Sequence, residues 1–304
     1  MNADAKVAVW LALLAGCTHP PPVTKPVART TATAAPPVPA DAPPVQLVPL
    51  EAHRTSIGHG WSLYLPEGFA LRNGRYDLVV HFHGEGRFQE RNVDQAGLVA
   101  AVVSVNMGGL GTEPYAKAFR SPDGFPRLLA AADAAIAEKV GGPAPKLGRL
   151  ALSAWSAGYS SVAAVLGDAA TADRVDAILL ADGLFTAFSD RKKRTVNDAG
   201  LDRIVRFAER AKRDEKLFVL THGAIPTGPY PSVQECTARL LERVSVPKSP
   251  ATGTGPLGMR RTYTADTGSL HVAGFDGMTA GDHVKELHAM GESAYPYLKT
   301  RWSK

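Results

Sequence analysis

The sequence predicts an α/β protein in which a mostly parallel sheet is covered by helices on both faces. Apolar runs rich in Val, Ile and Leu alternate with amphipathic stretches along residues 55–303. The apolar runs are continuous rather than alternating with polar residues, as in strands that are buried on both faces. One run, at 150–152, passes through small residues straight into a helical pattern.

Each apolar run is expected to be a strand, and each stretch with a period of about 3.6 residues is expected to be a helix. The expected strands are residues 55–65, 76–82, 98–105, 150–152, 175–181, 217–220 and 269–273. The expected helices are residues 123–140, 157–166, 198–213, 231–244 and 282–301, and the expected surface excursions are 186–197 and 247–260.

The N-terminal residues have the features of a targeting segment. An apolar run at 7–15 follows Lys6 and is too short to span a bilayer. It ends in Leu14-Ala15-Gly16-Cys17, which resembles a bacterial lipobox. The resemblance implies a signal peptide at 1–16, a lipidated Cys17 and a membrane anchor in the cell envelope, and Thr18 in place of Asp favours the outer membrane. A simple secretory signal with an incidental Cys is the alternative.

Residues 17–49 are rich in Pro, Thr, Ala and Val and almost free of charged and aromatic side chains. Such a segment cannot bury enough apolar surface to fold, and its prolines favour extended geometry. We therefore expect a disordered tether between the lipidated Cys17 and one folded domain at 50–304, which is long enough for a large core.

Composition limits the classes of partner. The formal net charge of +5 is spread along the chain, and no motif of interleaved basic and aromatic residues supports nucleic-acid binding. The one dense basic run, Arg191-Lys192-Lys193-Arg194, is either a solvated loop or a contact with anionic envelope surfaces. If Cys17 is acylated, Cys236 has no partner for a disulfide and is expected to be a core thiol.

Ser156 lies between the apolar run at 150–152 and the helical pattern, with Ala154 two residues before it and Gly158 two residues after. A strand that turns sharply into a helix needs small neighbours and leaves its turn residue strained and exposed. The pattern Ala-x-Ser-x-Gly resembles the nucleophile elbow Gly-x-Ser-x-Gly of the α/β-hydrolase family. The resemblance, over roughly 55–303, implies the α/β-hydrolase fold with Ser156 as nucleophile. A Ser/Ala/Gly-rich turn without chemistry is the alternative.

Ligands of open α/β sheets bind beyond the carboxyl ends of the strands, where Asp182 and His283 are also expected. The order Ser, Asp, His is the chain order of the family and implies His283 as the base and Asp182 as the orienting acid. Many members place the acid after the next strand, where this chain has no carboxylate before Glu235.

Several alternatives stay open at this edge. Asp182-Gly183 could be a plain turn, and Asp282-His283 a helix start capped by Asp282. His222 is the stronger rival base, and the weaker candidates are His271 and His288.

Acyl transfer needs N–H donors at the oxyanion. The amide of Ala157 follows the nucleophile, and the turn His83-Gly84-Glu85 resembles the family's His-Gly oxyanion loop, which implies Gly84 and Glu85 as further donors. Residues 107–120 are expected to overhang the site. A competing interpretation takes His81, His83 and Glu85 as metal ligands, because His-x-His places both rings on one face of a strand.

These observations predict a serine hydrolase of the cell envelope that cleaves an ester, thioester or amide through an acyl-enzyme on Ser156, without a cofactor. Its substrate would be a small-molecule or envelope acyl compound, and esters are favoured because they are the commonest substrates of the family. The alternatives are a non-catalytic binding protein with the same fold and a metal-dependent hydrolase that uses His81 and His83.

Overall fold

The structure is a computed structural model that describes residues 53–304, except 110 and 142–143. The predicted signal peptide at 1–16, the lipidated Cys17 and the tether at 17–49 lie outside the described residues. The described residues all belong to one compact unit. No helix among them combines the length and the apolar character that a membrane crossing requires.

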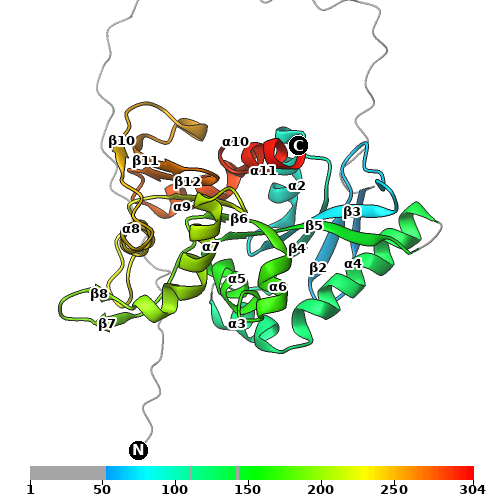
Figure 1. Ribbon diagram of the computed structural model, residues 1–304, viewed down its shortest axis with the longest axis horizontal. Helices are drawn as coiled ribbons and strands as arrows, with labels where there is room; N and C mark the ends of the chain where they lie inside the picture. The colour runs from blue at the N-terminus through cyan, green and yellow to red at the C-terminus, as the bar shows by residue number, and fades with distance from the viewer. Residues whose placement is uncertain (1–52, 110, 142–143) are drawn as a thin grey trace, which may run out of the picture. The chain divides into compact units, whose positions relative to one another are not determined.

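Ten strands form one sheet in the order β1-β2-β4-β3-β5-β6-β9-β12-β11-β10 (Figure 1). The central strands from β4 to β12 are parallel, and the outer strands on both edges are antiparallel. The strands are β1 (Arg54–Ser56), β2 (Trp61–Tyr64), β3 (Arg75–Phe82), β4 (Ala101–Val105), β5 (Lys146–Trp155), β6 (Val175–Ala181), β9 (Leu217–His222), β10 (Ser249–Pro250), β11 (Arg261–Thr267) and β12 (Leu270–Phe275).

Helices cover both faces of this sheet (Figure 1). One face packs against α4, α5, α7 and α8, and the other packs against α2, α10 and α11. The helices are α2 (Gly86–Ala96), α3 (Glu113–Arg120), α4 (Gly124–Val140), η1 (Ser156–Gly158), α5 (Tyr159–Val165), α6 (Ala169–Arg174), η2 (Asp198–Leu201), α7 (Asp202–Lys212), α8 (Val233–Arg243), η3 (Pro256–Gly258), α9 (Ala280–His288), α10 (Met290–Ser293) and α11 (Tyr295–Trp302).

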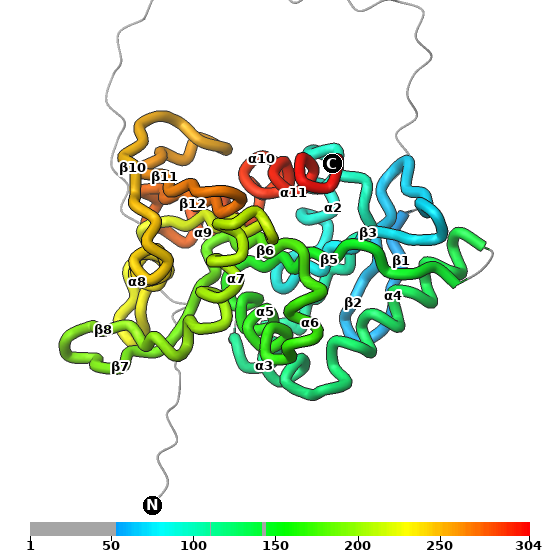
Figure 2. Tube along the Cα trace, in the orientation of Figure 1, coloured from blue at the N-terminus to red at the C-terminus, as the bar shows by residue number. Residues whose placement is uncertain are grey.

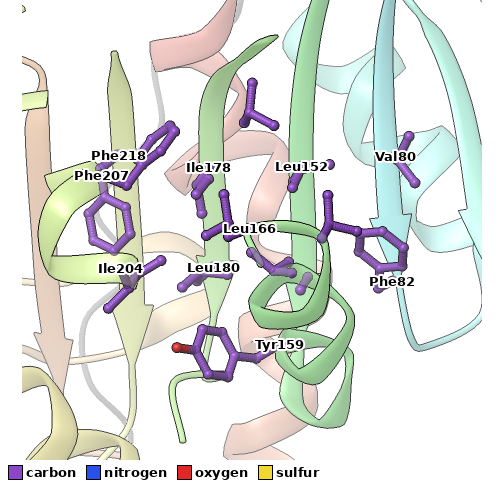
Figure 3. Packing of buried hydrophobic residues seen from close by; sticks show 14 of the residues in the cluster. Val80, Phe82, Leu152, Tyr159, Leu166, Ile178, Leu180, Ile204, Phe207 and Phe218 are labelled. Atoms are coloured by element: carbon purple, nitrogen blue, oxygen red, sulfur yellow. The ribbon is translucent and has the colours of Figure 1, made fainter. Parts of the chain in front are cut away.

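Two apolar cores follow from the two-residue period of the central strands. In β5, Leu150 and Leu152 belong to the core beneath α4 and α5, whereas Ala151 belongs to the core beneath α11. Figure 3 shows Tyr159 of α5 beside Leu180 of β6 in the first of these cores. Both faces of the central strands are therefore buried in an apolar core, which explains the continuous apolar runs in the sequence.

The predicted fold class is confirmed, and the differences lie in individual elements. Residues 55–65 form two strands, because Gly58 and Gly60 both take positive φ and turn the chain between them. Residues 282–301 form three helices, since Pro296 in the first turn of α11 cannot continue a helix from α10. Helix α2 was not predicted because its buried side is largely polar and gives no apolar period.

The excursion at 186–197 contains a small hairpin of β7 (Phe188–Asp190) and β8 (Thr195–Val196), which extends away from the rest of the fold (Figure 2). Its turn carries the basic run. Arg191, Lys192 and Lys193 are exposed there, whereas the Arg194 guanidinium pairs with the Glu235 carboxylate at 2.7 Å. Cys236 is a free, fully buried thiol, as predicted, and burial raises its pKa to about 12.

Candidate active site

The elbow at the end of β5 has the strained geometry that the sequence predicts. Trp155 is still extended, and Ser156 has φ 49°, in the left-handed region that non-glycine residues rarely adopt. A Cβ atom on Gly158 would lie 2.0 Å from the carbonyl oxygen of Phe82, so only glycine fits there. The small residue therefore lets the turn pass directly against the end of β3.

Asp182 and His283 meet at the same edge of the sheet, from two distant parts of the chain. The Nδ1–H of His283 donates to Oδ2 of Asp182 at 2.6 Å, and the amide of Gly223 donates to Oδ1 at 3.3 Å. Asp182 is 3% exposed, and its φ is 44°. Because Nδ1 carries the proton, the lone pair of the neutral imidazole lies on Nε2, the tautomer that a general base requires.

Helix α9 fixes the backbone of His283. Thr279 and Asp282 form a capping box, in which the Asp282 carboxylate also accepts from Lys285 at 2.9 Å. These hydrogen bonds, of which the one from Lys285 has the largest effect, hold the pKa of Asp282 well below its usual range. Asp282 therefore lies in the first turn of α9, but the residue that caps the helix is Thr279 and not Asp282, as the alternative interpretation had it. His283 in the same turn is bonded to Asp182.

The acid and the nucleophile are brought close by their backbones. A Cβ atom on Gly183 would lie 2.9 Å from both the nitrogen and the oxygen of Ser156, so the turn after β6 packs against the elbow. On the other side, the indole ring of Trp155 lies 4.6 Å from the imidazole of His283, centroid to centroid. The residue after Asp182 thus packs against Ser156, and the residue before Ser156 contacts His283.

The predicted oxyanion donors lie beside this elbow. Ala157 is in the first turn of η1, where amides have no intrahelical acceptor. Gly84 has φ 93° and Glu85 is the N-cap of α2, and among the described residues neither amide has a protein acceptor. A Cβ on Gly84 would meet Cε3 of Trp155 at 3.4 Å, which places this loop against the residue before Ser156.

His81 and His83 are engaged separately, which argues against the metal interpretation. His81 is bonded to the hydroxyl of Ser153 at 2.8 Å and donates from Nε2 to the carbonyl of His83 at 2.8 Å. Strand β3 has ended before His83, whose φ is 75°, and its ring is bonded to the hydroxyl of Tyr115 at 2.8 Å. The described residues contain no group of three His, Cys, Asp or Glu side chains that could hold a metal ion.

The other candidate histidines contact residues other than Asp182. His222 donates from Nδ1 to the carbonyl of Gly223, and its Nε2 accepts from the hydroxyl of Tyr263, both at 2.6 Å. Burial lowers its pKa, so the ring is neutral with no free lone pair. His271 pairs with Asp266, and the ring of His288 packs against Phe88 at an angle of 38°.

Three neighbours of the site were not predicted from the sequence: Tyr115, Trp155 and Glu286. Tyr115 of α3 is fully buried, and its hydroxyl is bonded to the ring of His83. Part of the segment 107–120 therefore belongs to the core of the domain. Glu286 of α9 is 1% exposed, and neither of its oxygens has a hydrogen-bond partner among the described residues. Burial, with the Asp182 carboxylate, raises the pKa of Glu286 to about 8. Only the spacing of Glu286 from His283, three residues on one helix, could have signalled it.

The strand order, the elbow after β5 and the positions of Asp182 and His283 agree with the predicted architecture. The fold is that of the α/β-hydrolases. No protein-family model and no curated protein matches the chain by sequence.

Solved structures resemble it at low identity. The feruloyl esterase module from Clostridium thermocellum has 14% identity, with a TM-score of 0.45 over 78% of this chain and 82% of that one. The acetyl xylan esterase from Aspergillus awamori has 14% identity, with a TM-score of 0.39 over 77% of this chain and 97% of that one. Est1E from Butyrivibrio proteoclasticus has 13% identity, with a TM-score of 0.41 over 80% and 95%.

Proposed function

We propose that the protein is a serine hydrolase that cleaves a carboxylic ester through an acyl-enzyme on Ser156. The observation that carries the proposal is the 2.6 Å hydrogen bond from His283 to buried Asp182, at the sheet edge where Ser156 occupies a strained turn. A binding protein would have no need to hold an imidazole in one tautomer beside a strained serine.

The residues divide the chemistry as follows. Neutral His283 takes the proton of the Ser156 hydroxyl through Nε2 as the oxygen attacks the ester carbonyl carbon. Asp182 stabilises the imidazolium that forms, and the amides of Ala157, Gly84 and Glu85 stabilise the oxyanion. The imidazolium then protonates the leaving alcohol, and a water molecule, activated by the same base, hydrolyses the acyl-enzyme. No step requires a cofactor.

The direct test is labelling with a fluorophosphonate, which reacts with an activated serine. Wild-type protein is expected to be labelled, and Ser156→Ala is not. Ser160→Ala is the matched control, because Ser160 is a half-buried serine one helical turn further along the same stretch. Equal labelling of wild type and Ser156→Ala, or turnover of esters by Ser156→Ala at the wild-type rate, would exclude Ser156 as the nucleophile.

The cellular setting is a second part of the proposal: Cys17 is lipidated and tethers the hydrolase to the cell envelope. The lipobox-like Leu14-Ala15-Gly16-Cys17 supports it. Acyl chains on Cys17 would anchor the protein, so wild type is expected in the membrane fraction and Cys17→Ser in the soluble fraction. A Cys17→Ser protein that stays membrane-bound to the same extent would contradict the anchor.

A further inference from the structure

Trp155 contacts two imidazoles, that of His83 next to the oxyanion loop and that of the base His283. Its indole ring stacks on His83, with centroids 5.0 Å apart and an interplanar angle of 11°. It also contacts His283, with centroids 4.6 Å apart and an angle of 32°. The Nε1–H of the same indole donates to the backbone carbonyl of His283 at 2.9 Å.

The same ring also borders the oxyanion loop. A Cβ on Gly84 would lie 3.4 Å from Cε3 of Trp155 and 3.0 Å from Cδ2 of Leu287 on α9. The loop therefore passes between the indole and α9 with no room for a side chain. Trp155, directly before Ser156, thus contacts both the start of α9, which carries His283, and the loop that would donate to the oxyanion.

We propose that Trp155 is a positioning residue for this site, and the inference rests on the proposed function. The hydrogen bond to His283 and the stack on His83 fix the base and the oxyanion loop relative to Ser156. In addition, the face of the indole stabilises His283 when it becomes an imidazolium, because the negative face of an aromatic ring attracts a cation within about 6 Å.

The other titratable groups near His283 can be separated from this effect. Asp182 bonds to it directly and is present in every variant below. Burial, then the charge of His283, lowers the pKa of His83 to about 4, so His83 stays neutral. On the helix of His283 itself, Asp282 and Lys285 pair with each other. Glu286 is buried beside Asp182, and its pKa is raised to about 8.

The experiment compares Trp155→Phe and Trp155→Leu in the mature protein. Phe keeps an aromatic face but loses the N–H donor, whereas Leu loses both. The first readout is an NMR titration of the His283 ring, which needs no turnover; its signal is assigned by its absence in His283→Gln. The second readout is the pH dependence of kcat/KM for an activated ester, with kcat and KM separated. Trp302→Phe is the matched control, because that indole also donates a hydrogen bond, to Asp176 at 2.7 Å, at the opposite edge of the sheet.

In Trp155→Leu, the midpoint of the His283 titration is expected to fall by about 0.5 to 1 pH unit, because the imidazolium loses its aromatic partner. Its kcat is expected to fall by about 10- to 100-fold with little change in KM, since a misplaced base costs turnover rather than binding. Trp155→Phe should keep most of the midpoint and lose about tenfold in kcat. Trp302→Phe should keep both.

A wild-type midpoint and a wild-type kcat in Trp155→Leu would overturn the inference. If Trp155→Leu does not fold, a wild-type kcat in Trp155→Phe would overturn it equally, because that variant lacks the hydrogen bond to the His283 carbonyl. Failure of the proposed function has a different signature, namely a wild-type protein that a fluorophosphonate does not label. The NMR titration still measures the effect of Trp155 on His283 in that case.

Discussion

The carboxyl ends of the central strands differ sharply from their amino ends. After β3, β5 and β6 the chain carries His83, Ser156 and Asp182, all with positive φ, and each such residue stores about 1–3 kcal/mol of strain. At the amino ends, the carboxylates of Asp77 on β3 and Asp176 on β6 are paired with arginines.

At the amino ends of the strands, the carboxylates of Asp77 and Asp176 accept hydrogen bonds from arginine and tryptophan side chains. Arg149 donates to Asp77 at 2.6 Å and to the backbone carbonyl of Trp302 at 2.6 Å. Arg301 and Trp302 both donate to Asp176, at 2.8 and 2.7 Å. The same sheet therefore carries strain and a buried carboxyl with a raised pKa, Glu286, at one edge, and a network of ion pairs and hydrogen bonds at the other. Stability gained at the amino ends allows strain to be held at the carboxyl ends.

The largest effect that would test this contrast is the loss of the reacting groups. Ser156→Ala and His283→Ala should each lower kcat by roughly 10³-fold or more, and the double variant should be little worse than either, because the residues act as one unit. Steady-state kinetics of the three proteins is the measurement, with Ser160→Ala as control. Multiplying losses in the double variant would show that the two residues act independently.

The next effect is on the packing of the acid turn against the elbow. Gly183→Ala places a methyl group 2.9 Å from backbone atoms of Ser156, so the turn must shift. We expect kcat to fall by about 100-fold, the cost of misplacing a catalytic group by about 1 Å. Gly228→Ala is the control, because a Cβ there meets nothing within 4 Å. Full activity in Gly183→Ala would show that the elbow tolerates movement.

Glu286, at the carboxyl ends of the strands, makes the folding stability depend on pH. Its pKa is about 8 in the folded protein against 4.5 in the unfolded chain, so between these values the folded state holds a proton that the unfolded state has lost. Folding stability therefore falls as pH rises from 4.5 to 8, and Gln, which resembles the protonated acid, removes this fall.

Glu286→Gln should thus match wild type at pH 4 and exceed it at pH 7, by about 3 kcal/mol. Urea unfolding at several pH values measures the difference. The same difference at every pH would show that Glu286 is ionised in the folded protein.

At the amino edge the expected effect is on stability alone. Asp176→Ala leaves Arg301 and Trp302 without their shared acceptor, which should cost about 1–2 kcal/mol and leave kcat of the folded protein unchanged. Asp173→Ala is the control, since Asp173 is 74% exposed in its pair with Arg210 and should change stability by less than about 0.5 kcal/mol. Loss of kcat in Asp176→Ala would mean that the two edges are coupled.

The sequence was informative wherever function depends on local pattern. Continuous apolar runs predicted the central strands, and the residues that follow these runs, Ser156, Asp182 and His283, could be placed at one edge because parallel strands end together. Tyr115, Trp155 and Glu286 could not, because their roles depend on contacts between residues far apart in the chain, such as Trp155 with His83 and His283.

Two elements with few buried apolar residues were also missed. Helix α2 buries the polar side chains of Gln89, Glu90 and Asn92. Strand β11 reads Arg-Thr-Tyr-Thr-Ala-Asp-Thr and buries only Tyr263 and Ala265, which is too short an apolar pattern to mark a strand. Their partners, among them Arg54 for Glu90 at 3.1 Å, come from other elements and become visible only in three dimensions.

The bonds of Arg301 and Trp302 to Asp176, and of Arg149 to the Trp302 carbonyl, determine when folding can finish during synthesis. Arg301 and Trp302 follow every strand that the structure describes, yet their bonds hold the starts of β5 and β6 at the centre of the sheet. A nascent chain that has not yet reached residue 302 therefore exposes the apolar face that α11 covers. The domain can complete its fold only after synthesis has passed that point, so a chaperone that shields this face until then would protect the protein from aggregation.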